Sequence, residues 1–428
     1  MASVLMASCP SAGHVGPVCA VAADLVRRGH RVRVLTGSTY ATQVESSGAE
    51  FLALPSEAVV DLDAEDRSPA GRPVGVRGIG YDVEHMFLRP MAGQYAALQA
   101  ALAAEPASVL ITEMLYMGAY PLTARPRADR PLVVLLGITP LPVAGGGTGP
   151  YGMGLRPDGG LRPLRNRVLR ALTSRFVFAD AEAYLAAEFE RLTGVPSAGS
   201  VFDLPLRTDV VLQLSPPGLE YPRPGLPVSV RFVGPLPTPV RGLPDPPWAA
   251  DLDGELPVVH VTQGTVANRD VGKLIVPAVA ALAERPVLVV LTAGGRSEEA
   301  LREAVVGALG RVPPNVRTAR FLDYTRLLPK VDALVTNGGF GTVTQALAHG
   351  VPLVVAGRSE DKAEVGARVA WSGAGIDLRT DTPSADRLDR AVGRVLFEPR
   401  YRAAARRLRE QVAGQSALDA ADALVRSA

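Results

Sequence analysis

The chain has 428 residues, enough for two or three domains. Its composition, 47% hydrophobic and 21% charged, is that of an ordinary globular protein and excludes an intrinsically disordered or collagen-like chain. The 45 basic and 43 acidic residues nearly balance, so nothing supports nucleic-acid binding, which requires a basic surface.

The cysteines and the apolar runs indicate the environment of the protein. We expect Cys9 and Cys19 to be reduced, because disulfides belong to oxidising compartments. No apolar run approaches the roughly 18 residues of a membrane span, and the N-terminal residues are typical of a strand and not of a signal peptide. No metal-ligand spacing is present. The sequence therefore predicts a cytoplasmic protein without a membrane span or a metal site.

The first half of the chain alternates short apolar runs with amphipathic stretches. Residues 17–28 repeat apolar side chains at helical spacing after a turn at Gly13 and Gly16, which predicts a helix. Apolar runs without alternation are typical of strands covered on both faces, as in a parallel sheet. By this criterion the expected strands are residues 4–6, 31–35, 108–111 and 132–136.

A proline-rich segment divides the chain. Residues 216–247 hold eleven of the 37 prolines, and proline fits neither a helix nor a central strand, so this segment predicts a stiff interdomain linker. A second α/β pattern follows, and the tail from Arg400 predicts one or two helices. The expected strands of this half are residues 258–261, 287–291, 333–335 and 353–355, and its expected helices are residues 271–283, 297–309 and 341–348.

Both halves therefore predict the α/β class, as two doubly wound, Rossmann-like domains. Open parallel sheets bind ligands at the carboxyl ends of their strands, so two such domains would face each other across a cleft. A shared cleft suits a reaction between two substrates, with one held by each domain.

The most informative stretch runs from Asp332 to Pro352. A strand there leads through Gly338, Gly339 and Gly341 into a helix. Glycine lets the backbone approach a ligand closely, and the first N–H groups of a helix are unpaired and lie at the positive end of its dipole. This turn therefore predicts a site for a phosphate or a pyrophosphate.

The same stretch resembles the nucleotide-sugar signature of family 1 glycosyltransferases with the GT-B fold, bacterial enzymes that modify macrolides, polyketides and other lipophilic small molecules. The residues at matching positions are Gly338, Gly339, Gly341, Thr342, Ala346, Leu347, Gly350, Val351 and Pro352. Residues 13–17 and 27–32 resemble the family's opening strand, turn and helix, so the resemblance covers essentially the whole chain. It implies an acceptor-binding domain at residues 1–215 joined by a C-terminal helix at 406–428, the linker at 216–247, and a donor-binding domain at 248–405.

The resemblance also implies how a nucleotide-diphosphate sugar, with uridine or thymidine as its base, is bound. Phe321 would stack on the base, and the backbone of Leu322 would contact its edge. Gln345 would bind the ribose, and Asp361 and Lys362 would bind the sugar hydroxyls. The diphosphate would lie against two turns, which contain Gly264, Thr265, Asn337, Gly338, Gly339, Gly341 and Thr342.

Three of these positions depart from the family signature. Asn337 stands where the family has histidine, and its amide can still donate a hydrogen bond to phosphate. Gln345 replaces a glutamate, so the ribose would be bound without charge assistance. Lys362 replaces a glutamine and can donate to a sugar hydroxyl but not accept. These departures leave the identity of the donor sugar open.

The resemblance assigns the chemistry to His14, which occupies the family's general-base position and has a near-neutral pKa suited to removing a proton from an acceptor hydroxyl. Glu113 stands where the family has an aspartate that stabilises the imidazolium. The helix that begins at Gly339 can stabilise the leaving diphosphate without a metal. One direct displacement would invert the anomeric carbon, with the nucleotide sugar as co-substrate and no further cofactor.

The acceptor site is expected in loops at residues 61–90 and 140–162, which are rich in glycine and proline. The residues that could line an apolar acceptor pocket are Met86, Phe87, Tyr116, Met117 and Tyr151. Two alternatives remain open, a non-catalytic glycosyltransferase-like partner and a nucleotide-sugar epimerase of the same fold. A second copy of the chain, in a homodimer, is a further candidate partner.

Overall fold

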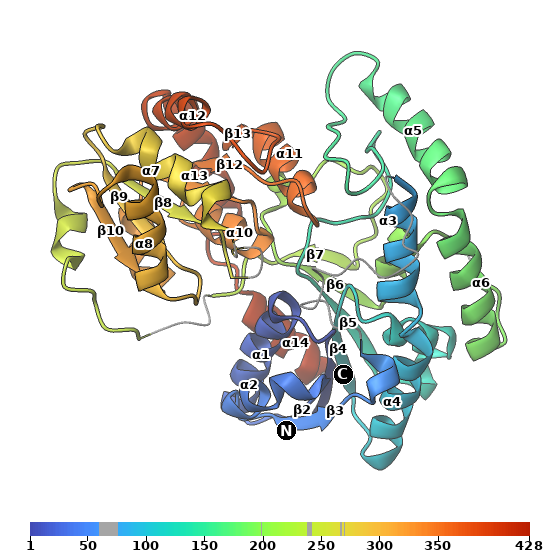
Figure 1. The fold of residues 1–428 in the computed structure, drawn as a ribbon. Helices are drawn as coiled ribbons and strands as arrows, with labels where there is room; N and C mark the ends of the chain where they lie inside the picture. The colour runs from blue at the N-terminus through green and yellow to red at the C-terminus, as the bar shows by residue number, and fades with distance from the viewer. Residues whose placement is uncertain (60–75, 198, 238–241, 266–267, 269) are drawn as a thin grey trace.

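The computed structural model describes residues 1–428 apart from 60–75, 198, 238–241, 266–267 and 269. The described residues form two α/β domains, each built on a parallel sheet (Figure 1). Hydrophobic clusters lie on both faces of each sheet, which accounts for strands that are apolar without alternation.

The first sheet has seven strands in the order β3-β2-β1-β4-β5-β6-β7. Helix α1 (Ala12–Arg27) packs on one face together with the C-terminal helix α14 (Ala417–Ser427), and α4 (Met91–Ala104) packs on the other. Further helices of this domain are α2 (Ala41–Ser46), α3 (Val76–Asp82), α5 (Arg162–Phe176) and α6 (Ala179–Thr193). The strands are β1 (Ser3–Ala7), β2 (Arg31–Thr36), β3 (Glu50–Ala53), β4 (Val109–Glu113), β5 (Leu132–Gly137), β6 (Val210–Gln213) and β7 (Val230–Phe232).

The second sheet has six strands in the order β10-β9-β8-β11-β12-β13. One face is covered by α7 (Ile275–Leu282), α8 (Glu298–Leu309) and α12 (Ala385–Phe397). The other is covered by α10 (Phe340–Ala348), α11 (Lys362–Ser372) and α13 (Pro399–Val412), with the short α9 (Tyr324–Leu327) nearby. The strands are β8 (Val258–Thr262), β9 (Leu288–Thr292), β10 (Val316–Ala319), β11 (Ala333–Thr336), β12 (Leu353–Val355) and β13 (Gly375–Asp377).

The start of α1 differs from the prediction. The helix begins at Ala12, so Gly13, His14 and Gly16 lie in its first turns and not in a preceding turn, and Pro17 lies inside the helix. The prediction began the helix at Pro17 because Gly13 and Gly16 favour a turn. Proline inside a helix removes one hydrogen bond, and α1 compensates with a buried apolar face.

The segment between the domains is also shorter than predicted. Residues 216–247 include β7, which is the edge strand beside β6, so the first domain continues to at least Phe232. An edge strand is the position in a sheet that tolerates neighbouring prolines. Part of the predicted linker, residues 238–241, lies outside the described residues.

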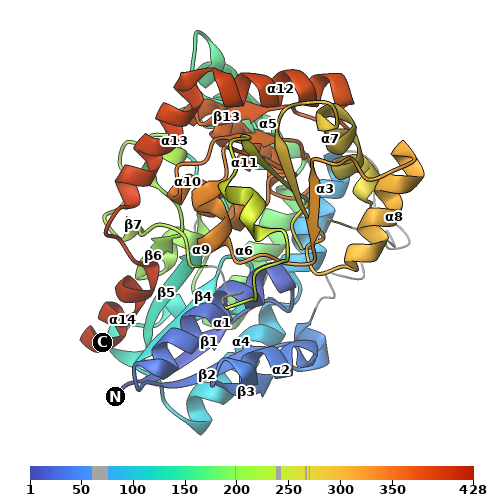
Figure 2. The same ribbon diagram turned by 90° about the vertical axis from the view of Figure 1, so that its left-hand side faces the viewer.

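The C-terminal tail crosses from the second domain to the first (Figure 2). Helix α13 packs in the second domain through Tyr401, Ala404 and Leu408, whereas α14 completes the core of the first. The chain therefore passes to the first domain between α13 and α14, whereas the predicted helix of the first domain begins at residue 406. Within the part of the chain that the structure describes, no helix is long and apolar enough to cross a membrane.

Candidate functional site

A histidine and a glutamate form a close pair at the carboxyl end of the first sheet. Strands β1 and β4 are neighbours, with Ala7 opposite Thr112, so the residues that follow them meet. His14 Nδ1 lies 2.7 Å from Glu113 Oε2. The Glu113 side chain has no exposed surface, whereas 14% of the His14 side chain is exposed. The carboxylate accepts a hydrogen bond from Nδ1–H of the neutral ring, which leaves the lone pair on Nε2.

The surroundings of Glu113 fix its charge and its direction. Its Oε1 accepts a hydrogen bond from the Cys9 N–H at 2.9 Å, and its Oε2 accepts one from the Leu115 N–H at 2.8 Å. Burial by itself would raise the pKa of Glu113, but the charge of His14 and these hydrogen bonds lower it below its ordinary value. Glu113 is therefore a carboxylate near neutral pH.

Glu113 in turn acts on His14. Burial would lower the pKa of His14, but the charge and the hydrogen bond of Glu113 outweigh burial and raise the pKa above its ordinary value. The charges of Asp361 and Glu360 in the second domain raise it further. Burial raises the pKa of Asp361 to about 6, against the opposing charges of Lys362 and His14. Charged groups of both domains therefore act on the pKa of His14.

The glycine-rich turn has one closed side and one open side. At Gly338, φ is +95° and an added Cβ would lie 2.7 Å from Val355 Cγ1, so only glycine fits there. Gly339 is the N-cap of α10 and Gly341 lies in its first turn. A Cβ at Gly341 would meet nothing within 4 Å, and Gly341 is exposed. The first turn of α10 is therefore open at Gly341, and the diphosphate site that the sequence assigns to it stays a prediction.

The second predicted turn lies beside this one. Asn337 Nδ2 donates to the Gln263 carbonyl at 2.6 Å, which joins the residues after β11 to those after β8. Gly264 has φ of +69°, and Thr265 is exposed. Asn337 therefore connects the two loops that the sequence assigns to the diphosphate.

Two polar residues in contact with each other, Tyr324 and His260, were not assigned to the site from the sequence. Tyr324 is half-buried, and its hydroxyl lies 3.1 Å from His260 Nε2. Burial raises the pKa of Tyr324 to about 12, although hydrogen bonds with Thr262, Thr292 and Thr342 oppose the shift. His260 is buried, with its Nδ1 2.9 Å from the Val290 carbonyl, and burial lowers its pKa to about 4. His260 is thus neutral, and its Nε2 contacts the Tyr324 hydroxyl.

The predicted base-binding and sugar-binding residues surround the same loops. Phe321 and Leu322 are half-buried, and a Cβ at Gly295 would lie 2.8 Å from Phe321 Cζ, so this ring lies directly on the loop after β9. The glycine pair 294–295 at the end of a strand is the signal that could have indicated this contact. Gln345 is half-buried one turn into α10. Lys362 is buried, and its ammonium pairs with Glu360.

The predicted acceptor residues divide into two groups. Tyr116 has no exposed surface, and its hydroxyl donates to the Gln94 carbonyl at 3.0 Å, while Met117 is buried in a neighbouring cluster. Both are core residues and not pocket walls, because their side chains pack into hydrophobic clusters of the first domain. Met86 and Phe87 are half-buried in the π-helical turn Val83–Leu88. Much of the predicted loop at 61–90 lies outside the described residues.

Tyr151 lies near the donor-side residues. Burial raises the pKa of Tyr151, and the charges of Asp361 and Glu364 raise it further. The N–H of the next residue, Gly152, donates to Glu364 Oε1 at 3.1 Å, so this segment of the first domain contacts a carboxylate of the second. In the described part of the chain, no group of three or more His, Cys, Asp or Glu side chains could hold a metal ion. Both cysteines are free, as predicted.

The comparisons with known proteins agree with this geometry. Residues 299–421 match the family model described as the C-terminal domain of proteins like erythromycin biosynthesis protein CIII. The chain is 41% identical to 4'-demethylrebeccamycin synthase of Lentzea aerocolonigenes over 98% of both proteins. It is 32% identical to UDP-glycosyltransferase 2 of Phaeomoniella chlamydospora over 97% of this chain and 93% of that protein.

A solved structure shows the same fold. The calicheamicin glycosyltransferase CalG4 matches with a TM-score of 0.72 and 23% identity, covering 99% of this chain and 97% of that one. The sequence motifs, the two facing parallel sheets and the full-length relatives lead to one assignment. The chain belongs to the family 1 glycosyltransferases of the GT-B fold, in their natural-product branch, and is a glycosyltransferase.

Proposed function

We propose that this chain transfers a sugar from a uridine or thymidine diphosphate sugar to a hydroxyl of a lipophilic natural product, with inversion and without a metal. The observation that carries this proposal is the 2.7 Å contact between His14 Nδ1 and Glu113 Oε2. The charge of Asp361 also raises the pKa of this imidazole. The relative named 4'-demethylrebeccamycin synthase supports a natural-product acceptor, and the one named UDP-glycosyltransferase supports UDP.

The chemistry is one displacement. The acceptor oxygen attacks the anomeric carbon as His14 Nε2 takes its proton, and the bond from that carbon to the diphosphate oxygen breaks. Glu113 remains a carboxylate and stabilises the imidazolium. The negative charge of the leaving diphosphate falls on the open N-terminus of α10, where unpaired N–H groups and the helix dipole favour it. Asp361, the N-cap of α11, would orient the sugar hydroxyls.

Nucleotide binding is the first test. A ligand that binds only the folded state at 100 times its Kd stabilises the protein by roughly 2.7 kcal/mol. We expect UDP or TDP, but neither GDP nor ADP, to raise the Tm, with a chelator present throughout. A transfer assay with the matching nucleotide sugar and a panel of phenol and alcohol acceptors follows. No shift with any of the four nucleotides would contradict the donor site.

Replacing Gly341 with alanine should separate binding from stability. The added Cβ meets open space in the free protein, so the free energy of unfolding should stay the same or rise by up to about 1 kcal/mol. The same Cβ would occupy the space that a phosphate must approach. We therefore expect Gly341→Ala to keep or raise the Tm and to lose the nucleotide-induced shift.

A matched control is Gly393→Ala in α12, where a Cβ also meets nothing within 4 Å. This variant should keep the full nucleotide shift, because Gly393 lies on a helix without a role in the site. An unchanged shift in Gly341→Ala would show that the diphosphate does not lie on α10.

The two alternatives give different results in the same assays. A non-catalytic partner would bind the nucleotide and transfer no sugar to any acceptor. An epimerase would change the donor sugar without an acceptor. The cytoplasmic location and the homodimer remain predictions that these assays do not address.

A further inference from the structure

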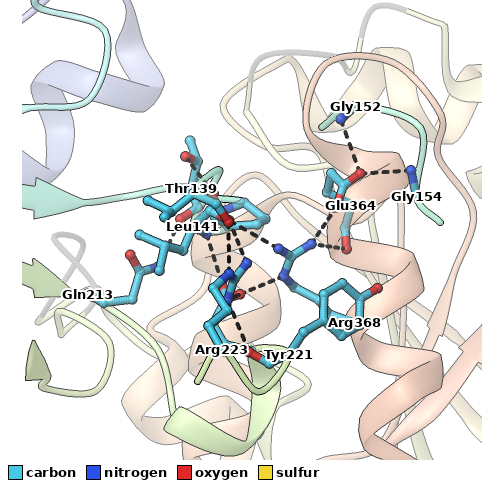
Figure 3. Close-up of polar contacts among 12 residues, drawn as sticks. Thr139, Leu141, Gly152, Gly154, Gln213, Tyr221, Arg223, Glu364 and Arg368 are labelled. Atoms are coloured by element: carbon cyan, nitrogen blue, oxygen red, sulfur yellow. Dashed lines mark hydrogen bonds and ion pairs between the residues drawn. The ribbon is translucent and has the colours of Figure 1, made fainter. Parts of the chain in front are cut away.

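Helix α11 carries a second carboxylate that contacts the first domain. Glu364 lies one turn after Asp361 and is buried. Its Oε1 accepts hydrogen bonds from the Gly152 N–H at 3.1 Å and the Gly154 N–H at 2.8 Å (Figure 3). Both glycines belong to the chain segment between β5 and α5, so one side chain of the donor-side domain fixes the backbone of a loop in the other domain.

A close backbone approach marks the same contact independently. Gly154 has φ of +60°, and a Cβ there would lie 2.4 Å from the Ala363 carbonyl oxygen. Both the left-handed conformation and the lack of space require glycine. The loop therefore lies directly against the first turn of α11.

Arg368 holds Glu364 in this position. Its Nη1 donates to Glu364 Oε2 at 2.5 Å, and its Nε donates to Glu220 Oε2 at 2.9 Å. Its Nη2 donates to the carbonyl of Leu141, at the start of the same loop, at 3.2 Å. Only 2% of the Arg368 side chain is exposed. The orientation of Glu364 is thus fixed by a buried cation that also contacts the loop.

The loop carries Tyr151, which is one of the predicted acceptor residues. The charges of Asp361 and Glu364 both raise the pKa of its hydroxyl. We propose that Glu364 is a positioning residue that seats the loop of Tyr151 against the donor-side helix and so sets the binding of the acceptor. The inference rests on the proposed function. Because Asp361 and Glu364 share one helix turn, the acceptor loop is placed relative to the group that would orient the sugar.

Two variants break this contact from opposite sides. Glu364→Gln removes the negative charge that pairs with Arg368 and accepts the N–H groups of Gly152 and Gly154. Gly154→Ala places a Cβ against the Ala363 carbonyl oxygen. We expect each variant to speed amide hydrogen exchange at residues 152 and 154 at least tenfold. Each should raise the acceptor KM about tenfold and leave the UDP- or TDP-induced shift in Tm unchanged. The double variant should raise KM no further than the stronger single variant, because both remove one contact.

Matched controls separate positioning from general destabilisation. Gly194→Ala imposes the same left-handed strain, with φ of +71° and nothing within 4 Å, at the end of α6. Glu188→Gln removes a carboxylate that pairs with Arg191 at 2.6 Å on the same helix. Both should keep the wild-type acceptor KM.

The outcomes are distinct for the two proposals. A wild-type chain that transfers no sugar to any acceptor contradicts the proposed function, and the exchange measurement still tests the loop contact. Wild-type turnover with unchanged exchange and acceptor KM in both variants overturns the inference. Equal loss of acceptor and nucleotide binding, or an equal rise in KM in Gly194→Ala, also overturns it, because the contact would then only support the fold.

Discussion

Replacing His14 with alanine should lower kcat with an alcohol acceptor by about 10²-fold to 10⁴-fold, the usual contribution of a positioned general base. The acceptor hydroxyl keeps its proton in this variant, so its oxygen is a poor nucleophile. The nucleotide-induced shift in Tm should persist, because the predicted diphosphate loops lie in the other domain. Wild-type turnover in His14→Ala would show that another group takes the proton.

The pH dependence of Glu113→Gln tests the pair as a unit. Glu113 holds the pKa of His14 above its ordinary value, and the base must be deprotonated to act, so kcat/KM of the wild type should fall as the pH drops below the raised pKa of His14. Glu113→Gln removes the charge that raises this pKa. The acidic limb should therefore move to lower pH, and the plateau rate should fall because the imidazolium loses its partner. An acidic limb that stays in place would contradict the pairing.

Eight of the thirteen described strands could be predicted, because they are short apolar runs covered on both faces. The strands that were not predicted are β3, β6, β7, β10 and β13. The expected strand at 353–355 matches β12, and most of the others differ by one or two residues at an end. The start of α1 was missed because Gly13 and Gly16 favour a turn, whereas burial of the helix face decides in the protein. The strand β7 was missed because proline content argues against a strand, and an edge position removes that objection.

The candidate site was predictable only where a local motif carries it. The glycines of the α10 turn and the pair of His14 and Glu113 stand in such motifs, and the neighbouring strands β1 and β4 bring the pair together. Tyr116 was assigned to the acceptor pocket because it is aromatic and follows β4, but the turn there directs the ring into the core. The contacts of Arg368 have no sequence signal, because they join residues that only the packing of the two domains brings together.

Replacing Arg368 with methionine should lower the free energy of unfolding by about 3–5 kcal/mol, the usual cost of removing one partner from a buried ion pair. Glu220 and Glu364 would both lose their shared cation while staying buried. The Glu220 carboxylate keeps the Arg223 guanidinium at 3.1 Å and the Leu141 N–H at 2.8 Å. Among the described residues, Glu364 would keep only the N–H groups of Gly152 and Gly154 and no cation, so its burial accounts for most of the loss. The ring of Tyr221, 4.6 Å from the guanidinium carbon, would lose its cation–π contact as well.

Urea unfolding, followed by one probe in each domain, measures this change in the free energy of unfolding. The control is Arg394→Met, which removes a surface pair with Glu398 and should leave the urea midpoint unchanged. Arg368→Lys should recover only part of the loss, because an ammonium cannot meet Glu220, Glu364 and the Leu141 carbonyl together as the planar guanidinium does. The two domains should also unfold less cooperatively in Arg368→Met, since the same guanidinium connects α11 to the first domain. Full stability in Arg368→Met would mean that the two carboxylates gain water or a proton in the variant, and that the charge network contributes orientation without stability.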